Sequence, residues 1–117
     1  MYGKYEIRTV KNGQYYFNLK AGNSEVILTS ETYLTKASAE NGIASCRENS
    51  PYDERYSRLT ATNSEPYFTL RAANHQVIGT SELYSSTQAR ETGIASCKTN
   101  GPTAPVVDLT AQTAGAY

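Results

Sequence analysis

The chain has 117 residues, in which 11 basic and 11 acidic side chains give a formal net charge of zero. A neutral chain has no overall field to draw it to nucleic acid or anionic lipid, and no apolar run is long enough to span a membrane. Two cysteines are too few for a disulfide scaffold and lack metal-ligand spacing. A chain of this length can bury about 65% of its unfolded surface as one domain.

The first third of the chain predicts a three-stranded meander. Residues 1–10 are polar and alternating, without the apolar segment of a signal peptide, so we expect a cytoplasmic protein. Alternation and turn residues predict strands at 5–10, 15–21 and 26–30, with turns at 11–13 and 22–24. Asn12-Gly13 favours a two-residue hairpin, and we expect asparagine to supply the left-handed residue of the turns.

A helix is predicted over residues 35–48. Thr35 is a suitable N-cap, Asn49 falls where a left-handed C-terminal cap is expected, and Pro51 stops the helix. Gly42 inside this pattern costs about 1 kcal/mol relative to alanine. It indicates two short helices, one helix that tolerates this cost, or one helix that packs closely against the sheet or a second helix.

The same pattern then recurs. A shift of 51 positions (97 − 46) aligns residues 16–51 with residues 67–102 without a gap, and more than half of the pairs are identical. This is a tandem duplication. The second copy predicts strands near 56–61, 67–72 and 76–80 and a helix over 86–99.

A further strand follows each helix. After the first helix, that strand is also the first strand of copy two; after the second helix it is "VVDL", residues 106–109. One three-stranded unit with one helix makes a thin core, so we expect the units to trade these strands. The prediction is an α+β fold: two tandem β3-α-β repeats in one sheet with exchanged C-terminal strands and both helices on one face. We expect a monomeric, pseudo-twofold single domain over residues 1–110, with repeats at about 3–55 and 54–109 and a flexible tail at 111–117.

The repeated pattern L-K/R-A-x-N…V-I…T-S-E…Y…G-I-A-S resembles the YegP-like family of small bacterial proteins, from about Tyr5 to Val107. The resemblance implies tandem units of three strands, a helix and a strand within a single sheet. It implies no assigned activity and supplies no catalytic, cofactor-binding or metal-binding residues. Cys46 and Cys97 stand where valine is expected, which favours a core role for both.

The second strands carry the candidate ligand face. Alternation puts Phe17 and Leu19 on one side of the sheet and the polar residues of the strand on the other, and copy two repeats this. If the helices cover the phenylalanine side, an open face is lined by Tyr16, Lys20, Tyr67 and Arg71. Aromatics interleaved with cations are typical of single-stranded nucleic-acid platforms, but zero net charge favours an ordinary amphipathic face. Apolar residues in the third strands suggest that this second face is partly covered, for example by a partner chain.

Other candidate groups have simpler interpretations. Cys46 and Cys97 each follow an isoleucine by three positions, which indicates burial; the alternative is a redox pair. His75, the sole histidine, lies in a turn and we expect it to be solvated. The repeated T-S-E-x-Y at 29–33 and 80–84 is either a polar site or a set of side chains that satisfy backbone groups at the helix entry.

The first strands differ in phase. Ile7 aligns with Arg58 and Arg8 with Leu59, so the apolar alternation slips between copies, which a bulge would explain.

These observations favour a small non-catalytic binding or interaction module that uses the open sheet face, with an unidentified protein or ligand partner, no cofactor and no membrane contact. The alternatives are a weak binder of single-stranded nucleic acid, a thiol-responsive protein and, least favoured, an enzyme.

Overall fold

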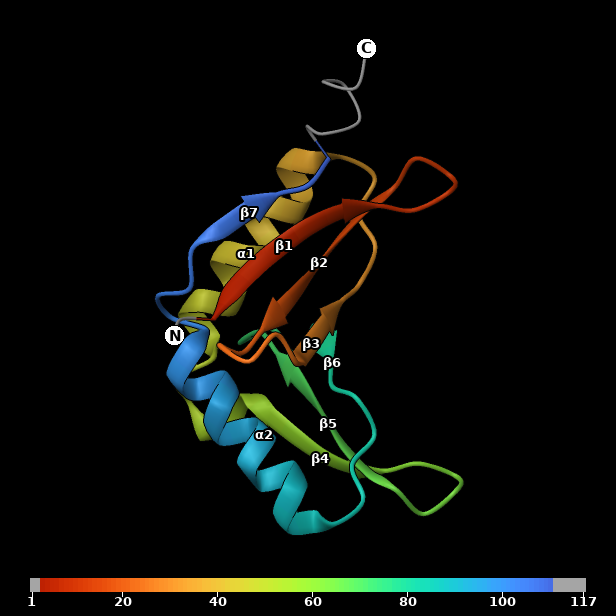
Figure 1. Ribbon diagram of the computed structural model, residues 1–117, viewed down its shortest axis with the longest axis vertical. Helices are drawn as coiled ribbons and strands as arrows, with labels where there is room; N and C mark the ends of the chain where they lie inside the picture. Colours follow the sequence, from red (N-terminus) through yellow and green to blue (C-terminus); the bar gives the residue numbers. More distant parts are fainter. Residues whose placement is uncertain (1–2, 111–117) are drawn as a thin grey trace.

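The structure, a computed structural model, describes residues 3–110, so the tail predicted at 111–117 lies outside the described residues. The elements alternate as the duplication requires, three strands and a helix in each half (Figure 1). In order they are β1 (Lys4–Thr9), β2 (Tyr15–Lys20), β3 (Val26–Ser30), α1 (Lys36–Asn49), the short 3₁₀ helix η1 (Asp53–Arg55), β4 (Tyr56–Thr60), β5 (Pro66–Arg71), β6 (Val77–Thr80), α2 (Thr87–Asn100) and β7 (Val106–Asp108). Neither described α-helix is long and apolar enough to cross a membrane.

All described strands join one sheet, in the order β4-β5-β6-β3-β2-β1-β7. The two meanders meet in the middle, where β3 and β6 run antiparallel and pair Thr29 with Thr80 and Ser30 with Gly79. Since an antiparallel joint between equivalent strands relates the halves by a pseudo-twofold axis, the predicted α+β fold of two repeats in one sheet is confirmed.

In the exchange of C-terminal strands, the strand that follows α2 is added to the first half of the sheet as a separate strand. β7, which follows α2, runs parallel to β1 of the first half, pairing Val106 with Tyr5 and Asp108 with Ile7. The segment after α1 crosses to the second half, where it becomes β4 and pairs with β5 alone. The middle segment therefore serves as both the strand after the helix and the first strand of copy two, as the sequence predicts, and β4 has no counterpart of β7 beside it.

Both helices cover the same face of the sheet (Figure 1). Each is continuous over 14 residues and begins at the predicted N-cap, where the Thr35 or Ser86 hydroxyl accepts a hydrogen bond from the backbone three residues on. The predicted left-handed C-terminal cap at Asn49 is wrong, because the C-cap is Ser50, in right-handed geometry. The Asn49 side chain instead donates to the Ser45 carbonyl within the last turn, at 2.8 Å.

The core lies between the helices and the sheet and is continuous across both halves. Each half contributes an aromatic group in which a phenylalanine contacts one tyrosine edge-on and stacks on another. The members are Tyr5, Phe17 and Tyr33 in the first half and Tyr56, Phe68 and Tyr84 in the second.

All four hairpin turns share one geometry, and it differs from the predicted one. Each loop has three residues, and its left-handed residue is the one that directly follows the loop asparagine. These left-handed residues are Gly13, Ser24, Ser64 and His75. In every turn, the side-chain oxygen of the preceding asparagine accepts a hydrogen bond from the backbone N–H two residues after that asparagine. Asparagine therefore sets the turn through its side chain, not through a left-handed backbone.

The first strands are in phase, so the bulge suggested for them is wrong. Ile7 pairs with Phe17, and Arg58 pairs with Phe68 in the same register. What differs is the position in the sheet: β1 lies between β2 and β7, whereas β4 is an edge strand. Arg58 can therefore reach solvent and the helix carboxylate Glu91, and a charge on an edge strand also discourages further strand pairing.

Bulges occur instead in the third strands, where the pairing with the second strand skips Ile27 and the equivalent Ile78. The pairing register shifts between Leu19 and Lys20, and again between the equivalent Leu70 and Arg71. The shift lets consecutive residues of the third strand, such as Ile27 and Leu28, both enter the core. Apolar residues in the third strands thus give no reason to expect a cover over the second face.

Candidate functional site

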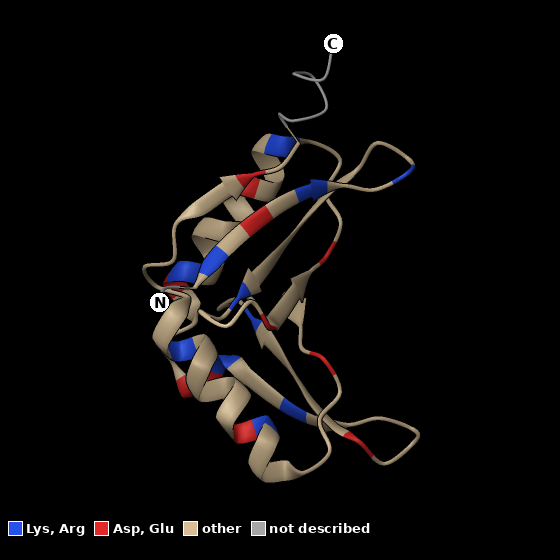
Figure 2. Ribbon diagram, viewed as in Figure 1, with Lys and Arg blue, Asp and Glu red and all other residues tan. Residues whose placement is uncertain are grey.

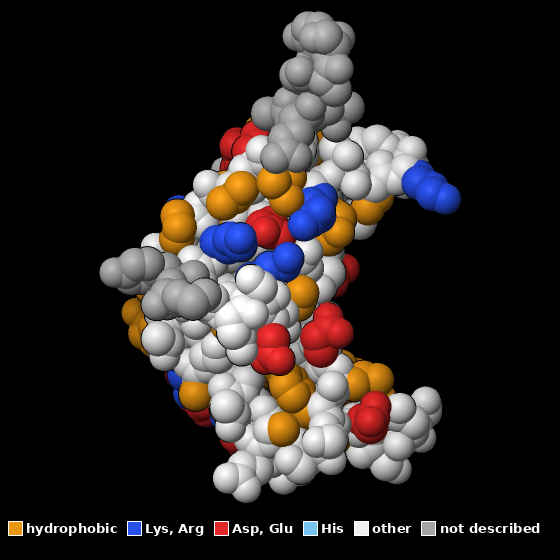
Figure 3. Space-filling view, in the orientation of Figure 1, with side chains coloured by type: hydrophobic (Ala, Val, Ile, Leu, Met, Phe, Trp, Pro, Cys, Tyr) orange, Lys and Arg blue, Asp and Glu red, His pale blue; other side chains and the backbone are white. Residues whose placement is uncertain are grey.

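The open face, by which we mean the side of the sheet opposite the helices, carries a cluster of charge in the first half. β1 alternates basic, acidic and basic residues along its length (Figure 2). Glu6 is buried, and its carboxylate accepts contacts from Lys20 and Arg8, each at 2.9 Å, and from Lys4 at 3.4 Å. Basic side chains surround an acidic one over this part of the molecule in the space-filling view (Figure 3).

This cluster holds Lys20 in place. Burial alone would raise the pKa of Glu6, but hydrogen bonds from Lys20 and Arg8 outweigh it and lower the pKa to about 2. Glu6 is therefore charged at neutral pH. Because three cations share one carboxylate, positive charge remains in excess at this end of the face.

In the second half, the equivalent cation has a neutral hydrogen-bond partner in place of the carboxylate. Arg71 occupies the position of Lys20, and its Nε donates to the Ser57 hydroxyl at 3.2 Å, where the first half has Glu6. A second guanidinium nitrogen donates to the His75 carbonyl at 2.8 Å. Arg71 is oriented by hydrogen bonds, and no carboxylate neutralises it in these contacts.

The two predicted tyrosines are half-buried and sit in different surroundings. Tyr16 pairs across the strands with Arg8, so its ring has a cation as its neighbour on the face. Tyr67 pairs with Leu59 at the equivalent place. Tyr16 therefore has a basic cross-strand neighbour and Tyr67 an apolar one.

The cysteines lie away from this face. Cys46 and Cys97 are fully buried in the core, as predicted, and both are free thiols. Burial raises the pKa of Cys97 to about 11, and it raises the pKa of Cys46 further still. Neither thiol has the exposure or the thiolate character of a reactive cysteine, which counts against the thiol-responsive hypothesis.

His75 is exposed in the β5–β6 turn, as expected, with a left-handed backbone at φ 71°. Among the described residues, no three His, Cys, Asp or Glu side chains are grouped in a way that could hold a metal ion.

The T-S-E-x-Y motif satisfies backbone groups, but not those of the helix entry. The Ser30 hydroxyl accepts from the Phe17 N–H at 2.8 Å and donates to the Glu31 carbonyl at 2.7 Å, and Ser81 does the same for Phe68 and Glu82. The serines therefore join the third strand to the second. The helix entry is capped by other residues, as described above.

The tyrosine of each motif explains the helix glycine. A Cβ added at Gly42 would overlap the hydroxyl oxygen of Tyr33, and one at Gly93 would overlap that of Tyr84. The close-packing interpretation is confirmed, and the two-short-helix alternative is wrong. The neighbour is the motif tyrosine rather than the sheet backbone or the second helix.

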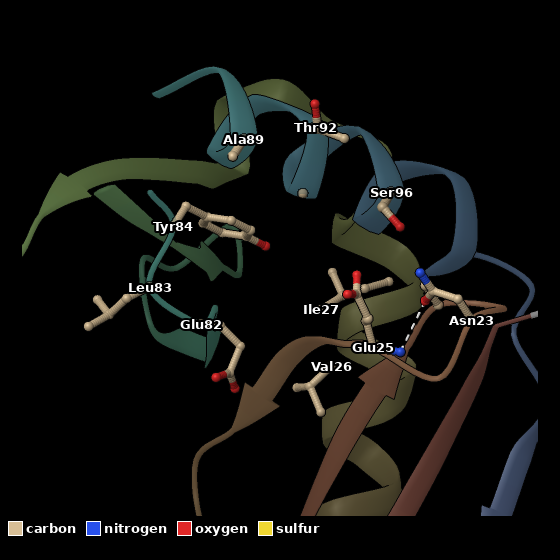
Figure 4. Close-up of a pocket in the computed structure, with 12 residues that line it drawn as sticks. Asn23, Glu25, Val26, Ile27, Glu82, Leu83, Tyr84, Ala89, Thr92 and Ser96 are labelled. Carbon is tan, nitrogen blue, oxygen red and sulfur yellow. Dashed lines mark hydrogen bonds between the residues drawn. The ribbon is translucent and has the colours of Figure 1, made fainter. Parts of the chain in front are cut away.

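The structure also contains a groove that the sequence analysis missed. It has a volume of about 820 Å³ and lies between the β2–β3 turn of the first half and α2 of the second. Tyr84 and Glu25 point into it, and Asn23 of the turn accepts the Glu25 N–H at 3.0 Å (Figure 4). Its lining comes from three segments that are distant in sequence, namely Ala21 to Ile27, Glu82 to Tyr84, and one face of α2 from Ala89 to Ser96. No sequence motif marks such a groove, because it exists only where the halves meet.

Comparison with known proteins identifies relatives along the whole duplication. Two stretches, residues 11–57 and 61–108, each match a domain of unknown function, DUF1508. A UPF0339 protein of Acinetobacter baylyi is 64% identical over 110 residues, which is 94% of this chain and 99% of that protein. The UPF0339 protein YegP of Escherichia coli K12 is 56% identical over 110 residues, 94% of this chain and all of that protein.

Solved structures with the same fold have been determined by NMR in solution. A UPF0339 protein from Shewanella oneidensis superposes with a TM-score of 0.91 at 52% identity and covers 100% of this chain and 99% of its own. YegP from E. coli, described as a protein of unknown function, gives a TM-score of 0.89 at 55% identity over 94% of this chain and 95% of its own.

Proposed function

This chain belongs to the DUF1508 family, which includes the bacterial UPF0339 protein YegP, and we propose that it is a small non-catalytic binding module that engages a protein or ligand partner on the open face of its sheet. The observation that carries the proposal is the repetition of one tyrosine and one cation, at equivalent positions of the second strands, on the face that the helices leave uncovered. The residues are Tyr16 with Lys20 and Tyr67 with Arg71.

The two cations of the proposed face are already held in place by contacts within the protein. Lys20 is held by Glu6, and Arg71 is held by Ser57 and the His75 carbonyl. A cation that is fixed before a partner arrives loses less side-chain entropy on binding. Tyrosine adds a large, rigid contact surface with a polar tip, which is why it is common at interfaces.

The burial and positions of the potentially reactive side chains support the non-catalytic part of the proposal. Cys46 and Cys97 are buried with raised pKa values, and His75 is an exposed turn residue. His75 reaches the proposed face through its backbone, whose carbonyl accepts a hydrogen bond from Arg71.

Single-stranded nucleic acid is a second candidate partner, favoured by one observation. The Tyr16 ring lies beside Arg8 in a cluster with excess positive charge, which is the combination of stacking and phosphate contact that such ligands use. The neutral chain argues for weak binding, since phosphate contacts dominate the affinity.

The test is a titration of ¹⁵N-labelled protein with pooled single-stranded oligonucleotides and, separately, pooled peptides. We expect amide shifts clustered on β2 and β5, which the double variant Tyr16→Ala/Tyr67→Ala abolishes. The matched control is Tyr52→Ala, because Tyr52 is 51% exposed and lies outside the strands. Shifts that spare β2 and β5 in both titrations would refute the proposal, and shifts with oligonucleotides alone would make nucleic acid the partner.

A further inference from the structure

The groove between the two halves has a chemical character of its own. At about 820 Å³ it falls in the range of small-molecule sites, which are concave and mostly apolar with a few placed polar groups. We propose that it binds a small organic cation, specifically a primary ammonium ion carried on an alkyl chain. This site is separate from the open face.

The charges around the groove favour a cation. Glu25 comes from the β2–β3 turn and Glu82 from the β6–α2 connection, so the groove is lined by one carboxylate from each half of the protein (Figure 4). No lysine or arginine is among the residues that line the groove. Neither carboxylate forms an ion pair with the described part of the chain, whose salt bridges involve Glu6, Asp53, Glu91 and Asp108.

Tyr84 provides the third contact. Its ring points into the groove, and its hydroxyl, packed on Gly93, makes no hydrogen bond to another described residue (Figure 4). Burial raises the pKa of Tyr84, and Cys97, Glu82 and Glu25 raise it further. An ammonium group has three donors for these acceptors, and an aromatic ring adds a cation–π attraction.

The remaining lining suits an alkyl chain. Val26, Ile27 and Leu83 present apolar side chains to the groove, and Leu83 is 51% exposed, so a ligand chain that covered it would remove apolar surface from water. In the space-filling view, acidic side chains flank hydrophobic ones in the middle of the molecule, below the basic cluster (Figure 3).

The duplication supplies an internal comparison. The equivalent hollow, between α1 and the β5–β6 turn, has a volume of about 520 Å³ and shares the alanine, asparagine and serine positions of the first. There Gln76 replaces Glu25 and Thr32 replaces Leu83 in the sequence, and Arg55 lines the hollow. Glu48 also lines this hollow, but beside Arg55, so an acidic lining without a cation belongs to the first groove only.

Three probes with the same alkyl chain test the proposal: hexylammonium, hexanoate and hexanol, each titrated into ¹⁵N-labelled protein at low salt. We expect hexylammonium to shift amides of the β2–β3 turn, residues 82–84 and α2, and hexanoate to leave them unmoved. Glu25→Gln and Glu82→Gln should each weaken hexylammonium binding about threefold, and the double variant about tenfold, because both carboxylates are exposed and exposed charge pairs are weak. Glu31→Gln is the matched control, because Glu31 is the exposed repeat equivalent of Glu82 and does not line the groove.

Three results would overturn the inference. The first is no groove shift with hexylammonium, and the second is hexanol binding as tightly as hexylammonium, since the carboxylates would then play no part. The third is a lysine-containing peptide that binds at least tenfold more tightly than hexylammonium, which would make the occupant a protein segment. None of these results tests the role of Tyr16 and Tyr67. The proposal for the groove can therefore fail while the proposal for the open face holds, and the reverse is also true.

Discussion

The hydroxyl of Tyr5 donates a hydrogen bond to the carbonyl of Gly101 at 2.6 Å, across 96 positions of sequence. Tyr5 stands in the first strand of one half, and Gly101 caps the helix of the other. The repeat equivalent, Tyr56 to the Ser50 carbonyl at 2.7 Å, connects the second half to the helix of the first. Each half therefore satisfies a buried acceptor at the end of its partner's helix, and the two bonds are related by the pseudo-twofold axis.

Removing the Tyr5 hydroxyl should destabilise the protein. Tyr5→Phe leaves the Gly101 carbonyl without this donor in the interior, which we expect to lower the free energy of unfolding by about 1.5 kcal/mol. Tyr56→Phe should cost a similar amount, and exposed Tyr52→Phe should cost almost nothing. Urea unfolding followed by circular dichroism measures all three. Equal stabilities for Tyr5→Phe and Tyr52→Phe would contradict the role given to this bond.

Gly93→Ala should destabilise the protein although alanine is the better helix former. The added Cβ would overlap the Tyr84 hydroxyl, and overpacking of this kind costs about 1–3 kcal/mol, more than the ~1 kcal/mol gained in helix propensity. In a Tyr84→Leu background the overlap is absent, so Gly93→Ala should become stabilising. The sign of the Gly93→Ala effect, measured by urea unfolding in the two backgrounds, decides the point; the same sign in both would be incompatible with the proposed overlap.

Ser64→Gly should stabilise the β4–β5 hairpin. Ser64 has φ 73°, a left-handed conformation that side chains resist, and its repeat equivalent in the first half is Gly13 at φ 84°. We expect a gain of about 0.5–1 kcal/mol after the greater flexibility of glycine in the unfolded chain is subtracted. The reciprocal change Gly13→Ser should lose a similar amount. Thermal unfolding of the pair measures both effects, and a loss of stability in Ser64→Gly would refute the explanation of these turns.

Acid should weaken the protein in part through Glu6. The pKa of this carboxyl is about 2 in the folded protein against an ordinary 4.5, so the folded state binds the proton less readily than the unfolded chain does. The stabilisation is present above pH about 4.5 and is lost as the pH falls towards 2. Urea unfolding at pH 7 and pH 3 should show a larger loss in the wild type than in Glu6→Gln. Asp53 and Asp108, whose pKa values hydrogen bonds also lower to about 2, titrate in both proteins and cancel in the comparison. Identical losses would mean that the Glu6 cluster contributes no pH-dependent stability.

The halves should not fold separately. β7 belongs to the second half of the sequence and completes the sheet of the first, and the core runs across the joint between β3 and β6. We expect residues 1–50 and 51–117, expressed alone, to give amide spectra of unfolded chains and to regain native shifts when mixed. Two separately folded monomeric halves would disprove the prediction of a single domain.

Part of the candidate site follows from the sequence. Strand alternation assigns Tyr16 and Lys20 to the face opposite Phe17, and the duplication assigns Tyr67 and Arg71 in the same way. Alternation carries no information on partners, so it does not predict that Glu6 holds Lys20 while Ser57 holds Arg71. Those contacts depend on which residues of the neighbouring strand face the same way, and that is a matter of register.

Two predictions from the sequence were wrong because the same residues are compatible with two local structures. Asparagine is common in turns both for its left-handed backbone and for its side-chain acceptor, and the structure uses the second, placing Gly13, Ser24, Ser64 and His75 in the left-handed position. The slip between Ile7 and Arg58 likewise suggested a bulge, although an edge position for β4 explains it.

The sequence by itself determined the repeat, the helices and strands, and the need for the two halves to share a sheet. Hydrophobic periodicity and turn chemistry act over a few residues, and because of the duplication each of these signals occurs in both halves. Only the tertiary structure decided that Tyr33 and Tyr84 occupy the space left by the helix glycines, and that Glu25 and Glu82 line one groove. Those relationships depend on how the chain closes around the pseudo-twofold axis, and no spacing along the sequence records which side chains that closure brings together.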